Sequence, residues 1–489
     1  MNGRAATIIA GLVFAADAAA MIFPHLDYSA HLERGRPGEE SFGTLVDDPP
    51  TQVIPSPPLP IDYERTITPA MAAAIAAYEA HLENRDFEQA VDSARLLLDV
   101  IAEELGSDHV EYAYALSDLG AALHHAGRNE EALAPLQESI SLIGAANGLY
   151  SPVLIGPMAY LGMAFQGLER HEPALDALTR AQHITHRHWG AMNPYQLKLV
   201  YAKAASLESL NELHEAEDQL RLGLKLSREQ HGEEALESLP ALYYLAEWLR
   251  ATGAFRPALS LYRDAMLMLA GPDGEDTPAM VPAMRGMAAT FLLEQDVEVD
   301  RGLTLHRRIV ELMEARPEAF SATDRIQAYA DLGDWLILFE REEEAWDAYG
   351  KAWALGQSDP TRDWNEYFAE PRLIYAGPNL TVDFMGYQVI GEEVYYDFEF
   401  RIREDGRPSH VKVRDSNLST LTRSRAIGFL RLGKFRPAIV DGKPVERRDY
   451  RIRRYYPTVA PWDYGKVILG GGFGSTPRTR LERRWPGSR

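Results

Sequence analysis

The stretch that decides the fold is residues 160–181, YLGMAFQGLERHEPALDALTRA. It contains the pair Leu161-Gly162 and, twelve residues after the glycine, Ala174, each within an apolar pattern that has helical spacing. The alanine recurs at steps of 42 residues, and a fixed period of this size predicts a stack of structural repeats. The members of the series are Ala90, Ala132, Ala174, Ala216 and Ala258.

Each period reads as two amphipathic helices joined by a short turn. In the second period the turn covers residues 126–129, where Gly127 supplies a left-handed helix cap. Gly120 and Ala132 are small because we expect the two helices to cross there, and a large side chain at either would cost about 1–3 kcal/mol. Two less regular units follow, one with Gly302 in the place of the alanine. We therefore expect a mainly α chain, an α-solenoid of about seven helix pairs over residues 70–358.

This pattern resembles the tetratricopeptide repeat, and the 42-residue step is similar to the variant found in kinesin light chains. The resemblance implies an array that binds a peptide or protein partner along the first helix of each unit. Candidate residues lie on the face of these helices opposite the packed stripe; the alternative is that they are ordinary helix surface. The candidates are His124, Gln166, Lys198, Tyr201, Tyr243, Glu247 and Arg250.

Composition argues against several classes of partner and of chemical site. Residues 1–360 carry 26 Lys and Arg against 56 Asp and Glu, whereas residues 361–489 carry 24 against 16. Phosphate binding requires basic side chains, so the acidic array argues against a nucleic-acid partner. The chain has no cysteine, which excludes disulfides and thiol catalysis. The histidines at 183, 186 and 188 fit an ordinary helix C-terminus better than a metal site. We expect no metal, no cofactor and no enzyme activity.

The N-terminus has the layout of a secretory signal peptide. Residues 1–20 place Arg4 before an apolar run, and small residues follow that suit cleavage after Ala18 or Ala20. The alternatives are an uncleaved anchor, which is the only case in which we expect membrane contact, and a cytosolic helix. Residues 21–69 form a Pro-rich linker. We therefore expect export to the periplasm, or anchoring in the inner membrane facing it.

After Pro360 the helical spacing of apolar residues ends, and apolar and polar residues begin to alternate. The face formed by Val394, Tyr396, Phe398, Phe400 and Ile402 predicts a strand, followed by a hairpin turn and a second strand. A helix over 421–432, a turn at Asp441-Gly442 and a last strand through Ile452 complete the pattern. We expect residues 361–456 to form a small α+β domain with an antiparallel sheet, and residues 361–489 to fold without the array. Residues 457–489 read as a basic, Gly-rich tail.

The order strand–strand–helix–strand resembles the C-terminal domain of TonB-type energy transducers over residues 390–456. The matching sequence segments include residues 435–438, FRPA, and 442–445, GKPV. The resemblance implies a periplasmic module that pairs by strand addition with a short segment of an outer-membrane transporter. The candidate edge is Arg451, Ile452 and Arg453, and the alternative is that these arginines protect the edge from pairing.

Two functions follow from these expectations. The first is a periplasmic protein–protein interaction scaffold, in which the array binds one partner and the C-terminal domain acts as a second interaction module. The second is an energy-transducing or outer-membrane transport accessory protein. An array of helical repeats occupies the place of the extended Pro-rich spacer of a transducer, which favours the first.

Overall fold

The computed structural model describes residues 67–271, 274–294, 299–375, 394–416 and 420–456. The expected signal peptide, nearly all of the expected linker and the basic tail lie outside the described residues. Contacts divide the chain into two compact units, one ending at Val299 and one beginning at Asp300. Each unit is described by itself below.

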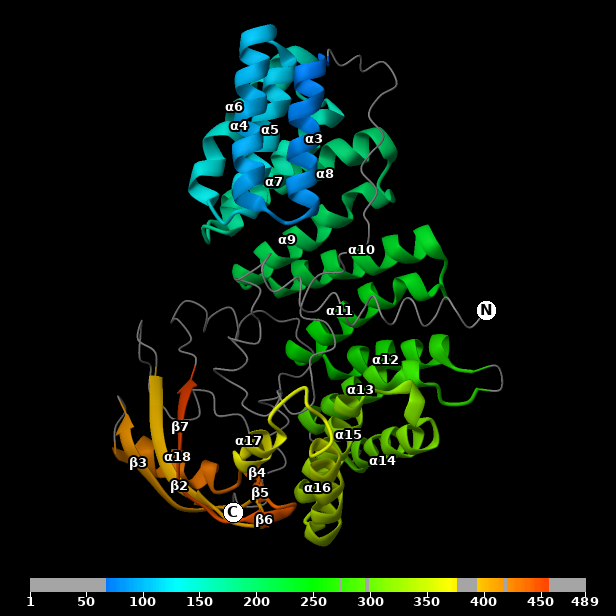
Figure 1. Cartoon of the computed structure of the whole chain (residues 1–489), viewed down its shortest axis with the longest axis vertical. Helices are drawn as coiled ribbons and strands as arrows, with labels where there is room; N and C mark the ends of the chain where they lie inside the picture. The colour runs from blue at the N-terminus through cyan, green and yellow to red at the C-terminus, as the bar shows by residue number, and fades with distance from the viewer. Residues whose placement is uncertain (1–66, 272–273, 295–298, 376–393, 417–419, 457–489) are drawn as a thin grey trace. The chain divides into compact units, whose positions relative to one another are not determined.

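In the described residues up to Gly356, fourteen α-helices follow one another in the order expected for seven pairs (Figure 1). Within the pairs, contacts join α3 to α4, α5 to α6, α7 to α8, α9 to α10, α11 to α12 and α15 to α16. Short 3-10 turns such as Pro152–Leu154 and Pro194–Gln196 precede several first helices and account for part of the long period. The helices are α3 (Pro69–Glu83), α4 (Phe87–Glu104), α5 (Val110–His125), α6 (Asn129–Asn147), α7 (Ile155–Gln166), α8 (His171–Trp189), α9 (Leu197–Ser209), α10 (Leu213–His231), α11 (Leu239–Ala251), α12 (Phe255–Leu269), α13 (Val281–Glu294), α14 (Val299–Ala315), α15 (Ala322–Leu338) and α16 (Glu342–Gly356).

The small residues lie where the two helices of a pair cross, as the sequence predicts. A Cβ atom added to Gly162 on α7 would lie only 2.6 Å from Cγ of Leu178 on α8 and 3.2 Å from the backbone oxygen of Ala174. The glycine therefore permits close approach of the two backbones. The five alanines of the 42-residue series are fully buried, which confirms the register of the repeat.

First helices of neighbouring pairs lie against each other in the first unit. Contacts join α5 to α7, α7 to α9 and α11 to α13, whereas second helices of neighbouring pairs make no comparable contact in the described residues. Helix-pair repeats that pack more closely on one side form an array that curves toward that side. We call α5, α7, α9 and α11 the inner layer.

The second unit joins the last helix pair to a small α+β assembly. A three-stranded antiparallel sheet has the order β3-β2-β7, while β1 pairs with β4 and β5 with β6. The elements after α16 are α17 (Trp364–Ala369), β1 (Arg372–Tyr375), β2 (Val394–Ile402), β3 (Pro408–Ser416), α18 (Thr420–Leu430), β4 (Lys434–Arg436), β5 (Ala438–Val440), β6 (Lys443–Val445) and β7 (Arg447–Tyr456).

The core of this sheet is the face predicted from alternation. Tyr396, Phe398, Phe400 and Ile402 are buried with Leu430 of α18 in one apolar cluster. The hairpin between β5 and β6 turns at Asp441 and Gly442, whose φ angles of 50° and 73° fit a two-residue turn with both φ positive. The fold class, a helix-pair solenoid followed by a small antiparallel α+β region, is confirmed.

The predicted boundary between the array and the C-terminal domain, near residue 361, does not coincide with the division of contacts, which leaves independent folding of that domain untested. The unit beginning at Asp300 contains both α15–α16 and the strands, and its boundary does not fall near Pro360. Strands β1 and β4 contact α15, and β6 contacts α16 (Figure 1). The physical reason is a buried ion pair between α15 and β4, described below.

Candidate functional site

The inner layer carries a polar side chain at the same place in four successive repeats. The residues stand 42 positions apart, near the C-terminal end of each first helix. We call this set the polar series: His124 on α5, Gln166 on α7, Glu208 on α9 and Arg250 on α11. The repeat register therefore gives one position of the first helices whose polar residue type varies from repeat to repeat.

The first two members of the polar series form hydrogen bonds with residues of the helix array itself. Nδ1 of His124 lies 2.8 Å from Oδ1 of Asn129. Burial lowers the pKa of His124, and this hydrogen bond acts in the opposite direction. Nε2 of Gln166 donates to the backbone oxygen of Ala202 at 2.6 Å and to Oγ of Ser206 at 2.8 Å, so it joins α7 to α9. Both side chains are half-buried.

Glu208, the third member, was not among the sequence candidates, although counting 42 residues from Gln166 would have found it. One carboxylate oxygen, Oε2, accepts a hydrogen bond of 3.3 Å from Nε1 of Trp248 on α11. No donor in the described part of the chain reaches the other oxygen, Oε1, which is buried. Burial raises the pKa of Glu208 to about 8, and the Trp248 hydrogen bond acts to lower it.

Four of the seven sequence candidates are buried, so the expectation that they lie on an open face is wrong. Tyr201, Tyr243, Glu247 and Arg250 are 5%, 5%, 8% and 4% exposed. The periodic pattern of apolar residues in the sequence identifies only the side of a first helix that packs on the second helix of the same pair. Inner-layer helices are also flanked by the neighbouring repeats, as in the edge-to-face contact of Tyr201 with Tyr244 at 5.6 Å.

Lys198 is the one sequence candidate on the inner layer that is exposed. It lies at the start of α9, two turns before Ala205 on the same helix. His124 and Gln166 keep partial exposure. The open part of the predicted surface therefore consists of Lys198, His124 and Gln166, and its aromatic candidates belong to the core.

Glu247 and Arg250 form a buried ion pair within α11. Nε and Nη2 of Arg250 donate to Oε2 of Glu247 at 2.9 Å and 2.6 Å. The hydroxyl of Tyr262 on α12 donates to Oε1 of the same carboxylate. Burial, followed by the negative charge of Glu247, holds the pKa of Tyr262 well above its usual range. The carboxylate is thus satisfied by one guanidinium and one tyrosine from its own helix pair.

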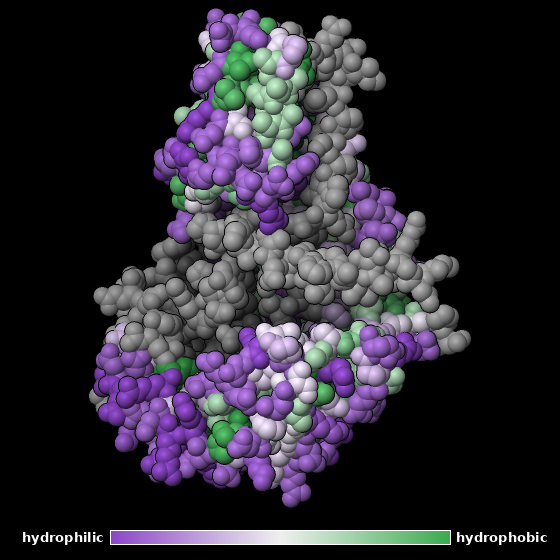
Figure 2. All heavy atoms as spheres, viewed as in Figure 1, coloured by the Kyte–Doolittle hydropathy of each residue, from purple (hydrophilic) through white to green (hydrophobic). Residues whose placement is uncertain are grey.

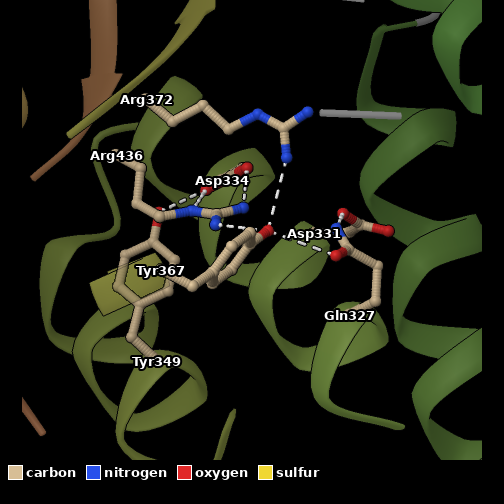
Figure 3. Close-up of polar contacts among 7 residues, drawn as sticks. All are labelled: Gln327, Asp331, Asp334, Tyr349, Tyr367, Arg372 and Arg436. Carbon is tan, nitrogen blue, oxygen red and sulfur yellow. Dashed lines mark hydrogen bonds and ion pairs between the residues drawn. The ribbon is translucent and has the colours of Figure 1, made fainter. Parts of the chain in front are cut away.

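A second buried carboxylate, on α15, takes its guanidinium from the sheet (Figure 3). Nε and Nη2 of Arg436 on β4 donate to Oδ1 and Oδ2 of Asp334 at 2.7 Å and 2.6 Å. Both side chains are essentially fully buried, and the hydroxyl of Tyr349 donates to Oδ1 of Asp334 at 2.8 Å. Burial is the largest single effect and acts to lower the pKa of Arg436, but the charge and hydrogen bond of Asp334, together with Tyr367 and Tyr349, outweigh it and hold that pKa well above its ordinary value.

Tyr367 of α17 extends this network. Its hydroxyl accepts from Nη1 of Arg436 at 3.0 Å and from Nη1 of Arg372 at 3.3 Å. The same hydroxyl donates to Oε1 of Gln327 on α15 at 3.2 Å (Figure 3). Three elements that follow the array are therefore joined to its last helix pair by charged and polar contacts.

The two buried carboxylates occupy the same repeat position. Glu247 and Asp334 each stand eleven residues before the repeat alanine, Ala258 or Ala345. Position 337, which corresponds to Arg250, is Ile337 in the last repeat. Arg436 of β4 thus supplies the charge that an internal repeat supplies for itself, and the two-stranded β1–β4 sheet completes the last helix pair.

The candidate strand-addition edge lies at one side of the three-stranded sheet. Strand β7 pairs with β2 over a register that includes Phe398↔Ile452, and no further strand of the described residues pairs with it. Arg451 is exposed and forms an ion pair of 3.1 Å with Glu399, while Ile452 is half-buried against the sheet core. The side chain of Arg453 lies outside the described residues. A cavity of about 450 Å³ is lined by residues of all three strands: Asp397, Phe398, Arg414, Arg451 and Ile452.

One face of the described surface is mainly polar. On the face shown in Figure 2, hydrophilic side chains cover most of the described helices, and apolar side chains form small separate groups. Within the described ranges, no group of three or more His, Asp or Glu side chains is arranged to hold a metal ion. Nor does any described helix have the length and apolar character needed to cross a membrane.

Solved structures with similar folds are distant in sequence. The nearly identical TPR-like repeats of a kinesin-light-chain-type protein from Podosopora anserina are 17% identical, with a TM-score of 0.37, and cover 42% of this chain and 97% of that one. BtubC from P. vanneervenii is 13% identical (TM-score 0.36; 51% and 91% covered). NprR, solved with its cognate peptide NprX, is 13% identical (TM-score 0.31; 60% and 81% covered). No curated protein matches the chain.

The family model for the tetratricopeptide repeat matches residues 71–143, which span α3 to α6. These are the first two helix pairs, with Ala90 and Ala132 buried at their crossings. Residues 71–143 are therefore similar to the tetratricopeptide repeat.

Proposed function

We propose that the protein is a non-catalytic scaffold whose inner layer binds a segment of a protein partner. The observation that carries the proposal is the stack of tetratricopeptide-type helix pairs, in which first helices lie together and present variable polar residues at one repeat position. Repeats of this kind expose extended concave surfaces suited to polypeptides. Lys198 and the half-buried Gln166 lie on this layer.

Site-specific photocrosslinking in cells tests this proposal. A photoreactive amino acid at Lys198, exposed on α9, should give covalent adducts with a partner protein. The matched control is Glu229, exposed on α10, a second helix outside the inner layer. Adducts from both positions alike, or from the control alone, would contradict recognition by the inner layer.

We propose that the C-terminal sheet is the second interaction module. Strand β7 is the outer strand of its sheet among the described residues, and an unpaired strand edge can accept a strand from another chain. The finer proposal, supported by the resemblance to TonB-type domains, is that the accepted strand belongs to an outer-membrane transporter. A crosslinker at Arg451 should then capture an outer-membrane protein, whereas one at Arg403, in the β2–β3 hairpin, should not.

We also propose that the protein works in the periplasm, because residues 1–20 have the order of a signal peptide. N-terminal sequencing of the protein from fractionated cells is the test. A new N-terminus after Ala18 or Ala20 in the periplasmic fraction is expected. An intact Met1 in the cytosolic fraction would contradict export, but it would leave the scaffold proposal standing.

A further inference from the structure

Glu208, which is half-buried, differs from the fully buried carboxylates of the helix pairs in what surrounds it. Glu247 has the guanidinium of Arg250 and the hydroxyl of Tyr262, and Asp334 has the guanidinium of Arg436 and the hydroxyl of Tyr349. Glu208 has the aromatic donor, since Nε1 of Trp248 lies 3.3 Å from Oε2. Its oxygen Oε1 is buried and receives no hydrogen bond from the described residues.

Two of the cations on α9 and α11 are engaged elsewhere. Nζ of Lys203, on the same helix, donates to Oε1 of Gln182 on α8 at 2.8 Å. Arg250, the next member of the polar series, pairs with Glu247. The preceding member on α7, Gln166, is uncharged and directs its amide to Ala202 and Ser206. One oxygen of the carboxyl thus lacks a donor among the described residues, and burying such a group costs free energy.

From this arrangement we infer that Glu208 and Trp248 form a subsite for an arginine side chain of the polypeptide that binds the inner layer. The inference rests on the proposed scaffold function and names the chemistry that the inner layer recognises there. Oε1 is buried and Trp248 is 8% exposed, so the half-buried side chain of Glu208 has to turn toward solvent before a guanidinium can donate to Oε1. The chain itself twice completes a buried carboxylate of a helix pair with a guanidinium, at Arg250 and at Arg436.

Charge complementarity favours the same ligand. Residues 67–299 carry 34 acidic and 15 basic side chains, so a cationic segment is attracted to the first unit from a distance. Release of a proton from Glu208 on binding is a measurable sign of this pairing. Because burial raises the pKa of Glu208 to about 8, the carboxyl is mostly protonated at pH 7, and pairing with an arginine must expel close to one proton.

The test is selection of random twelve-residue peptides on the full chain, on Glu208→Gln and on Glu229→Gln. The amide in Glu208→Gln keeps the shape of the side chain but cannot become an anion, and Glu229 is an exposed carboxylate on α10. We expect arginine to be enriched at one position in peptides selected on the wild type and on Glu229→Gln, but not on Glu208→Gln. The best peptide should bind Glu208→Gln about tenfold more weakly.

Calorimetry of that peptide in two buffers with different ionisation enthalpies measures the proton release. At pH 7 the wild type should release close to one proton per peptide, and Glu208→Gln should release almost none. Thermal melts of both variants show that the fold is kept. If Glu208→Gln melts early, Trp248→Phe, which keeps the ring but removes the N–H, replaces it in the affinity measurement.

The outcomes separate the two levels of the proposal. If peptides compete for the inner layer without arginine enrichment, or bind Glu208→Gln as tightly as the wild type, the arginine subsite is wrong and the scaffold proposal stands. Enrichment of lysine with no preference for arginine would also overturn it, because an ammonium would then be the ligand. If no peptide is selected on any of the proteins, the peptide-binding array and the subsite are both wrong.

Discussion

Replacing Arg436 by methionine is the sharpest test of how the sheet is joined to the repeats. Methionine keeps much of the volume but removes the two hydrogen bonds of 2.7 Å and 2.6 Å to Asp334. Asp334 and Arg436 are 0% and 1% exposed, so no water replaces the lost donor at the carboxylate. Breaking a buried ion pair by removing one partner costs about 3–5 kcal/mol, because the remaining charge stays buried and unpaired.

The loss should appear in the unit that begins at Asp300. With a shift of about 2–4 °C per kcal/mol for a unit of this size, the melting transition of that unit should fall by roughly 6–20 °C. Hydrogen exchange should locate the change, with faster exchange in α15 and in β1 and β4. The double variant Asp334→Leu/Arg436→Met should recover most of the loss, since it leaves no buried charge, although the hydroxyl of Tyr349 loses its acceptor at a cost of about 1–3 kcal/mol.

Arg448→Met is the matched control. Arg448 has a side chain that is 70% exposed and lies 3.5 Å from Glu446, so its loss should change the free energy of unfolding by about 0.5 kcal/mol at most. If the stabilities of Arg436→Met and Arg448→Met lie within about 1 kcal/mol of each other, the buried pair does not hold the sheet to the last repeat, and the reasoning fails.

Three further predictions concern the register, the pH dependence and the boundary of the second unit. Ala174→Trp should destabilise the first unit by at least about 1–3 kcal/mol through overpacking at the helix crossing, and Glu169→Ala, in the exposed turn, should not; equal melting temperatures would contradict the register. The pKa of Glu208 is raised to about 8 in the fold, so the folded state binds more protons than the unfolded chain and stability falls as the pH rises from about 4.5 to 8. Glu208→Gln should therefore melt higher than the wild type at pH 8 and nearly equally at pH 5, and an equal difference at both values would contradict the raised pKa. The fragment 361–489 should give a poorly dispersed amide spectrum while 300–489 gives a dispersed one, and a dispersed spectrum from the shorter fragment would show that the sheet folds without α15.

The alternation of apolar residues was enough to predict the central strand of the sheet. Tyr396, Phe398 and Phe400 face the core because alternate side chains of a strand point to opposite sides. The turn at Asp441-Gly442 followed from residue types that tolerate positive φ. Both features depend on neighbours in the chain, so they need no knowledge of distant contacts.

The sequence by itself determined the helix pairs, their number and the residues at their crossings, because the pairing of Gly162 with Ala174 is local and repeats at a fixed step. Tertiary structure alone decided what covers the other faces of the first helices, so Tyr201 and Tyr243 proved to be core residues. It also decided that Arg436, 102 positions from Asp334, completes the last repeat. Burial and ion pairing of this kind depend on which segments meet in space, and a local pattern carries no information about that.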